Sequence, residues 1–237
     1  MKNSLRILGI GMIAAAAFAL AAQDAWTLKR TANVGDVARY KLVADVELPG
    51  MGGAKVSGNV EEKVVAVEEN GAFVIESQQK STTITMEGQG EQEMPDQSPS
   101  KTKFGADGAV LEITSENPGA ADSYRISTLG AFRYPANAVK VGDEWSVDIA
   151  KDESKGIEAA KMTIKVEGNE TVGSWNTVKI KMTAKESAGD TPATADGFVW
   201  IDIPTGAIVK SETNWTNAPL PGAPFPINAK ITVTRES

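Results

Sequence analysis

Apolar and polar residues alternate over long stretches of the chain, as expected where successive side chains of a strand point to opposite faces of a sheet. The clearest runs are residues 40–48, 162–167, 178–185 and 229–234. In each run the apolar side chains fall on one face and mostly charged or threonine side chains on the other. Strands with one buried face and one wet face are typical of antiparallel sheet and not of βαβ units.

Turn residues separate these runs and predict hairpins in sequence order. Glycine with Asn, Asp or Thr, which favours tight reversals, occurs at Asn70-Gly71, Asp107-Gly108, Gly168-Asn169 and Thr205-Gly206. One stretch differs, because the pattern from Pro118 to Phe132 allows a short helix that Pro135 would end. The predicted fold class is all-β with minor α, an antiparallel sheet that forms a half-barrel, a barrel or a sandwich.

The order of these features recurs along the chain. Val34-Gly35-Asp36 precedes a predicted strand that contains Tyr40, and Val141-Gly142-Asp143 precedes one that contains Trp145. Each half then continues with a long hairpin, a polar loop and a compact aromatic-turn-strand unit. Any hairpin protein has turns at intervals, but here both order and spacing recur. We therefore predict an internal repeat, residues 34–133 and 141–237, within a single domain, residues 22–237.

The first residues have the layout of a secretory signal peptide. Lys2 and Arg6 precede an uncharged apolar stretch, and Ala19-Leu20-Ala21 supplies a small-residue cleavage site. A membrane anchor would need about 20 apolar residues, and this run ends before that at Gln23. We predict that residues 1–21 are removed, that the mature protein is periplasmic or extracellular, and that it does not insert stably into a membrane.

Composition excludes several kinds of chemistry. The chain has no histidine and no cysteine, so neither Ser-His-Asp nor Cys-His machinery can be built, and the usual zinc ligands are missing. The sequence has no glycine-rich phosphate loop and no EF-hand spacing of acidic residues. We predict no catalytic residues, no bound metal and no cofactor. The net charge of −7 would repel nucleic acid.

The aromatic residues leave two interpretations open. Trp145, Trp175 and Trp200 are most simply core residues, because aromatic rings bury large apolar areas. Alternatively, aromatic and inward-facing apolar residues line a concave cavity for an apolar ligand. The predicted lining of such a cavity consists of Tyr40, Leu42, Ile180, Met182 and Trp200.

Two segments carry a family resemblance. They are Phe198-Val199-Trp200-Ile201-Asp202 followed by Thr205-Gly206-Ala207-Ile208-Val209-Lys210, and Tyr134-Pro135 through Val141-Gly142-Asp143-Glu144-Trp145. They resemble the bacterial periplasmic lipoprotein-carrier (LolA/LolB-like) superfamily and related uncharacterised secreted β-rich families. The resemblance implies an incomplete antiparallel barrel around a helix, with a concave apolar interior that holds acyl chains. The low helix content and the duplication depart from that pattern, so no ligand residue is carried over.

Three functions compete on this basis. The first is an exported, non-catalytic protein of the cell envelope that binds or carries an apolar ligand such as a lipid. The alternative is a structural or protein-interaction module of the envelope with a filled core and no small-molecule ligand. An enzyme is least favoured, because the commonest acid–base and nucleophilic residues are missing.

Overall fold

The computed structural model describes residues 25–48, 50, 52–86, 88–116, 120–219 and 225–237. The predicted signal peptide, residues 1–21, lies outside them, and so do Pro118 and Gly119 at the predicted start of the helix. No helix in the described part of the chain is both long enough and apolar enough to cross a membrane.

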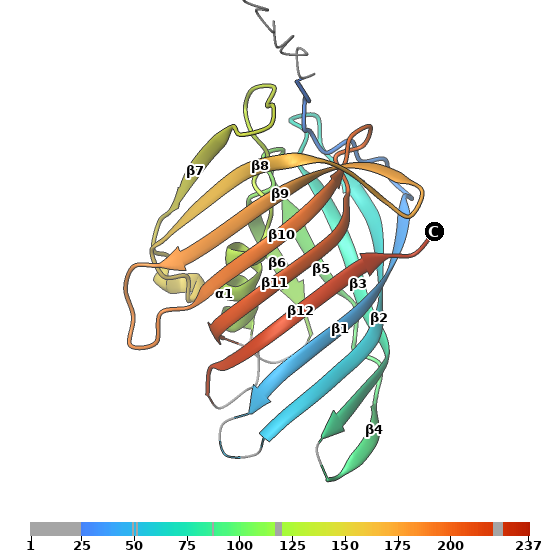
Figure 1. Ribbon diagram of the computed structural model, residues 1–237, viewed down its shortest axis with the longest axis vertical. Helices are drawn as coiled ribbons and strands as arrows, with labels where there is room; N and C mark the ends of the chain where they lie inside the picture. Colours follow the sequence, from blue (N-terminus) through green and yellow to red (C-terminus); the bar gives the residue numbers. More distant parts are fainter. Residues whose placement is uncertain (1–24, 49, 51, 87, 117–119, 220–224) are drawn as a thin grey trace, which may run out of the picture.

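The described strands form one 12-stranded antiparallel sheet (Figure 1). Those before the helix are β1 (Val37–Leu48), β2 (Gly52–Val67), β3 (Phe73–Met86), β4 (Gly90–Met94), β5 (Ser100–Phe104) and β6 (Val110–Ser115). Those after it are β7 (Glu144–Ile149), β8 (Ala160–Val172), β9 (Trp175–Glu186), β10 (Thr194–Asp202), β11 (Ile208–Ala218) and β12 (Ile227–Arg235). The order in the sheet is β6-β5-β3-β2-β1-β12-β11-β10-β9-β8-β7, and β4 pairs separately with β3.

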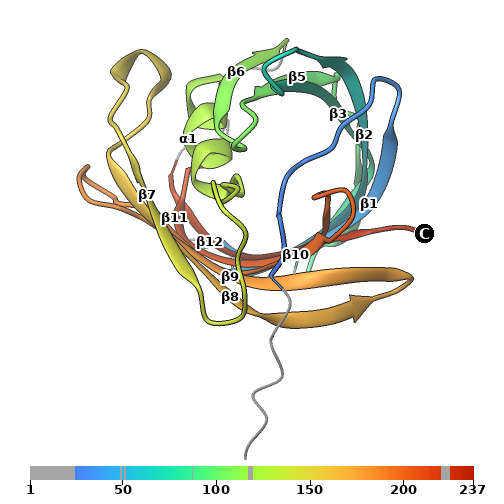
Figure 2. The same ribbon diagram turned by 90° about the horizontal axis from the view of Figure 1, so that it is seen from above.

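The first and last strands of the chain pair with each other, whereas the two strands at the ends of the sheet order do not. The last strand, β12, pairs along its length with the first strand, β1, with Tyr40 opposite Arg235 and Glu47 opposite Asn228. β6 and β7 are the two ends of the strand order, so the sheet curls without closing into a barrel (Figure 2). The all-β antiparallel prediction is confirmed, and of the shapes left open the structure is a single curled sheet.

The predicted short helix is confirmed as α1 (Ala120–Gly130), which lies within the curl of the sheet (Figure 2). It packs mainly against β6 and the 3₁₀ helix η1 (Glu153–Lys155), with smaller contacts to β9 and β10. Arg125 donates from Nε and Nη2 to the two carboxylate oxygens of Glu186 on β9, at 2.7 and 2.6 Å. On the other side of the helix, the hydroxyl of Tyr124 accepts a hydrogen bond from the backbone N–H of Ile113 at 2.8 Å. These contacts tie α1 to both parts of the sheet.

The core lies on the inner face of β8, β9 and β10. Register places Val166 opposite Ile180 and Ile180 opposite Val199, so the apolar residues of the alternating pattern form continuous rows across the three strands. Buried side chains from outside the sheet complete this core, namely Leu28 before β1, Leu129 of α1 and Phe132 after it. The alternation of apolar and polar residues along each strand therefore determines which side chains lie on the inner face, and the helix and its flanking segments cover that face.

The two Val-Gly-Asp turns have the same geometry. Gly35 N–H donates to the carbonyl of Val64 at 2.9 Å, and Gly142 N–H donates to the carbonyl of Val166 at 2.9 Å. Both glycines have positive φ, at 96° and 89°, a conformation that other residues rarely adopt. The shared turn fits the predicted internal repeat, and the descent of the two halves from one unit stays a prediction.

Candidate ligand cavity

The inner face of β1 to β6 is less completely covered than that of β8 to β10. Leu42, Val56, Val60, Ile75 and Ile113 occupy inner positions of these strands and are each partly exposed. A cavity of about 290 Å³ lies against this face, close to the lower end of the usual range for ligand pockets, about 300–1,000 Å³. Its apolar lining includes Phe73, Ile75, Phe104, Phe132 and Ile208.

Aromatic rings from two parts of the chain shape the cavity. Phe73 of β3 stacks on Phe104 of β5 with ring centroids 5.4 Å apart, as their direct pairing in the sheet requires. Phe132 and Tyr134, which follow α1, meet edge to face at 4.9 Å. Rings on opposite sides of a cavity supply a large apolar surface with few rotatable bonds. The cavity is therefore bounded by the sheet on one side and by α1 and its following segment on the other.

A segment that we call the strap, residues 25–36, crosses one end of the curled sheet (Figure 2). Trp26 exchanges two backbone hydrogen bonds with Val139, and Thr31 N–H donates to the carbonyl of Thr205 at 2.8 Å. Gly206 has a φ of +66°, and a Cβ there would overlap the backbone carbonyl of Lys29. Glycine at position 206 is thus required both by the turn and by the close approach of the strap.

The turn under the strap is the one that carries the family resemblance. Asp202 accepts hydrogen bonds from the backbone N–H and the hydroxyl of Thr205, and Gly206 N–H donates to the carbonyl of Asp202 at 2.8 Å. The Tyr134 hydroxyl donates to the carbonyl of Gly206 at 2.6 Å. The two segments quoted for the resemblance are therefore in contact, and Tyr134 and Ile208 from them line the cavity.

The lining also contains the charged side chains of Arg30 and Glu62 and, beside them, the hydroxyl group of Tyr40. Burial raises the pKa of the Glu62 carboxyl above its usual range, and the positive charges of Arg30 and Arg235 oppose that shift. Burial also raises the pKa of Tyr40, whose hydroxyl donates to the carbonyl of Ile208 at 3.2 Å. A half-buried carboxyl that forms no ion pair with any described residue is costly in a purely structural site and marks this end of the cavity as a functional candidate.

The five residues predicted to line a cavity are not brought together. Tyr40 lies in the lining, and Leu42 is partly exposed two positions along the same face of β1. Ile180 and Met182 lie on the inner face but are packed in the core, 0% and 3% exposed. Trp200 is opposite Lys179, next to the pair of Val199 and Ile180, which faces the core. Because successive side chains of a strand point to opposite faces, Trp200 lies on the outer face. There the ammonium groups of Lys179 and Lys210 lie 5.0 and 4.6 Å from its ring centroid. A ligand contact for any of the five stays a prediction.

The sequence analysis missed Arg30, Glu62 and the pair Phe73 and Phe104. The position of Glu62 could have been found from the sequence pattern. It lies two residues from both Val60 and Val64 on β2, so the alternation places its carboxyl on the inner, apolar face. Arg30 carried none, because the strap has no periodic pattern and its position follows from tertiary contacts. Phe73 and Phe104 belong to strands too far apart in the sequence for their stacking to be inferred from local pattern.

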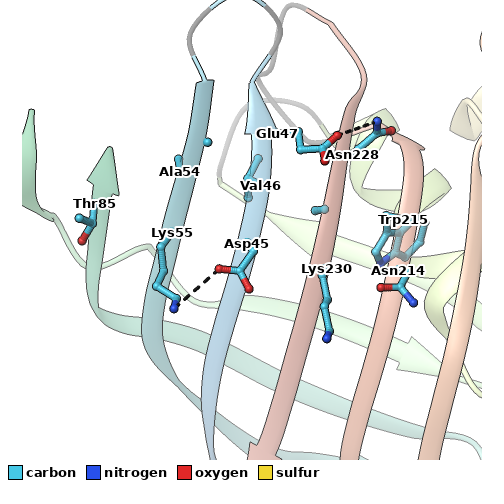
Figure 3. A pocket seen from close by; sticks show the side chains of 12 residues that line it. Asp45, Val46, Glu47, Ala54, Lys55, Thr85, Asn214, Trp215, Asn228 and Lys230 are labelled. Atoms are coloured by element: carbon cyan, nitrogen blue, oxygen red, sulfur yellow. Dashed lines mark hydrogen bonds and ion pairs between the residues drawn. The ribbon is translucent and has the colours of Figure 1, made fainter. Parts of the chain in front are cut away.

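A larger hollow of about 570 Å³ lies at the far end of β1, β2, β11 and β12 (Figure 3). Three of its four charged side chains have a polar partner: Lys55 lies 3.8 Å from Asp45, and the Asn228 amide donates to Glu47 at 3.2 Å. Among the residues described by the structure, no group of three or more acidic side chains could hold a metal ion. The smaller, aromatic cavity is therefore the stronger candidate site.

Comparisons with known proteins support the fold. No family model matches the sequence, and no curated protein matches it. A structure described as lipid–protein interactions in lipovitellin is similar, with a TM-score of 0.51 and 12% identity over 86% of this chain and 25% of the lipovitellin chain. The hypothetical lipoprotein YmcC from Escherichia coli (K12) aligns with a TM-score of 0.36 and 13% identity over 88% of this chain and 90% of YmcC. This chain thus spans about a quarter of the lipovitellin chain and is similar to that part in fold.

Proposed function

We propose that this protein binds a lipid or another apolar ligand in the cavity between β3, β5 and the segment that follows α1, and carries it outside the cytoplasm. The observation that carries the proposal is the aromatic cavity on a partly covered inner face. Largely apolar cavities with a few convergent polar groups are the usual form of small-molecule sites. The predicted signal peptide supports export, and the resemblance to lipoprotein carriers supports an acyl-chain ligand.

The contrast with the filled core supports binding over a purely structural role. Ile164 and Ile180 show that this sheet buries its inner apolar residues completely where the helix and strap cover them. The same residue types at Ile75 and Val60 are left partly exposed. Apolar surface exposed at the wall of a cavity costs stability unless a ligand covers it. The likeness in fold to lipovitellin is consistent with such a ligand.

The test is binding of a fluorescent fatty-acid probe, combined with native mass spectrometry of protein purified from its own envelope fraction. Ile75→Trp should fill the cavity and weaken probe binding at least about tenfold, because the added ring occupies the ligand volume. The matched control is Val74→Trp, because Val74 is opposite Lys103 and its side chain points to the outer face. It should leave probe affinity unchanged. A wild-type protein that carries no lipid and binds no probe would refute the proposal.

A further inference from the structure

The cavity continues into a second hollow of about 280 Å³, and both are lined by Arg30, Tyr40, Glu62, Ile75 and Ala207. We call this shared part the neck. Beyond it the lining becomes polar, and Asn33, Asp36 and Val37, which are exposed, bring the second hollow to the surface. The site therefore runs from an aromatic interior through a charged neck to a polar opening, which is the polarity profile of an amphiphile.

The second hollow is lined by two arginines without carboxylate partners, Arg30 in the neck and Arg235 beyond it. The described residues include five arginines, and Arg39, Arg125 and Arg133 each form an ion pair. Within the described part of the chain, no carboxylate oxygen lies within 4.0 Å of Arg30 or Arg235, and both line the second hollow. The two arginines left without an anion are thus the two that face this site.

Neighbouring groups hold both guanidinium groups near the opening. Arg30 donates to the carbonyl of Thr31 at 2.7 Å and lies over the Phe73 ring, 5.9 Å from its centroid. Arg235 lies 5.4 Å from the centroid of the Trp175 ring. Planar guanidinium groups kept in place by carbonyls and rings retain free N–H donors for a carboxylate or phosphate.

Two carboxyl groups modify this charge. Glu62 lies in the neck close enough to both arginines for their charges to lower its pKa against the effect of burial. Asp36 is exposed, and its carboxylate accepts hydrogen bonds from the backbone N–H and side-chain amide of Asn33, at 2.9 and 3.4 Å. Since solvent screens Asp36, the neck and the second hollow together hold two guanidinium groups against one half-buried carboxyl.

We propose that the ligand is a single-chain anionic amphiphile whose carboxylate or phosphate head is bound by Arg30 and Arg235, with its alkyl chain in the aromatic cavity. This inference rests on the proposed function and narrows its ligand class. Glu62 faces the same head group and limits the affinity for anions. Neutralising an arginine or neutralising Glu62 should therefore shift anion binding in opposite directions.

The test compares four ligands of equal chain length with the mature protein: dodecanoate, dodecyl phosphate, dodecanol and dodecylammonium. Wild-type protein should bind the better anion at least about tenfold tighter than dodecanol, and dodecylammonium most weakly. Arg235→Gln on β12 and Arg30→Gln on the strap should each weaken the anions roughly 10- to 100-fold and change dodecanol little. Glu62→Gln should strengthen the anions. Arg39→Gln, on the exposed outer face, is the matched control and should have no effect.

The outcomes separate the two proposals. Equal binding of anion and alcohol by the wild type, or an anion preference that survives both arginine substitutions, overturns the head-group assignment while the apolar cavity stands. Failure of all four ligands to bind overturns the proposed function as well. The tighter of the two anions identifies the source of the head group, a carboxylic acid or a phosphate ester.

Discussion

The two sides of the curled sheet carry the same alternating pattern and have different interiors. On β8 and β9, Ile164 and Ile180 are 0% exposed beneath Leu28, Leu129 and Phe132. On β2 and β3, inner apolar residues such as Ile75 are partly exposed, and a cavity separates them from the segment after α1. The pattern of a strand therefore specifies which face is inner, whereas elements outside the sheet decide whether that face is filled or hollow.

The largest expected effect is loss of the ion pair that fastens α1 to the filled side. Glu186 is 2% exposed and accepts from both Arg125 nitrogens and from the backbone N–H of Ala193. Glu186→Ala should lower the free energy of unfolding by about 3–5 kcal/mol, because Arg125 and the backbone N–H of Ala193 lose the Glu186 carboxylate in a water-poor site. Urea denaturation measures this. Asp45→Ala, which removes an exposed pair with Lys55, should stay within about 0.5 kcal/mol of wild type.

The next prediction compares the stability lost when the same substitution, Ile→Ala, is made on the filled side and on the hollow side of the sheet. Ile164→Ala should cost about 3–4 kcal/mol, because it opens a void in a fully packed core. Ile75→Ala should cost less than about 1.5 kcal/mol, because Ile75 is partly exposed and already borders a cavity. Equal losses in urea unfolding would show that the two sides are packed alike and would remove the distinction.

The sequence supported the strands far better than the site. In 178–185 every second residue is apolar, and β9 has the predicted inner face. At Val199-Trp200-Ile201 three consecutive apolar residues conceal the period, so the outer position of Trp200 could not be inferred from pattern. Arg30 and Phe73 reach the cavity through tertiary contacts. Local periodicity therefore predicts faces and strands, and it contains no information on what crosses over them.

A smaller effect concerns the strap, which contributes Leu28 to the filled side and Arg30 to the hollow side. Gly206→Ala should cost roughly 2–3 kcal/mol, because a left-handed φ is strained for alanine and its Cβ would overlap the Lys29 carbonyl. Gly142→Ala has a similar positive φ but no atom within 4 Å of the new Cβ, and so should cost only about 1 kcal/mol. Thermal unfolding compares the two, and a larger loss at Gly142 would contradict the close approach of the strap.

The smallest expected effect is a pH-dependent gain on the hollow side. Burial raises the folded-state pKa of Glu62 above its unfolded value, so the ionised carboxylate costs stability. That cost is absent below the unfolded pKa of about 4.3 and develops as the pH rises through the folded pKa. Glu62→Gln should therefore be more stable than wild type at pH 7, and the difference should vanish toward pH 4.

Asp107 provides a contrast of opposite sign. Burial raises its pKa, but the hydrogen bonds from the Ala109 backbone N–H and Arg133 outweigh that and lower the pKa below its usual range. Its stabilising contribution is present above the unfolded pKa and is lost as the pH falls through the folded pKa. Asp107→Asn should therefore be less stable than wild type at pH 7. A gain from Asp107→Asn, or a loss from Glu62→Gln at that pH, would mean that the surroundings of these two carboxyls do not differ as the structure indicates.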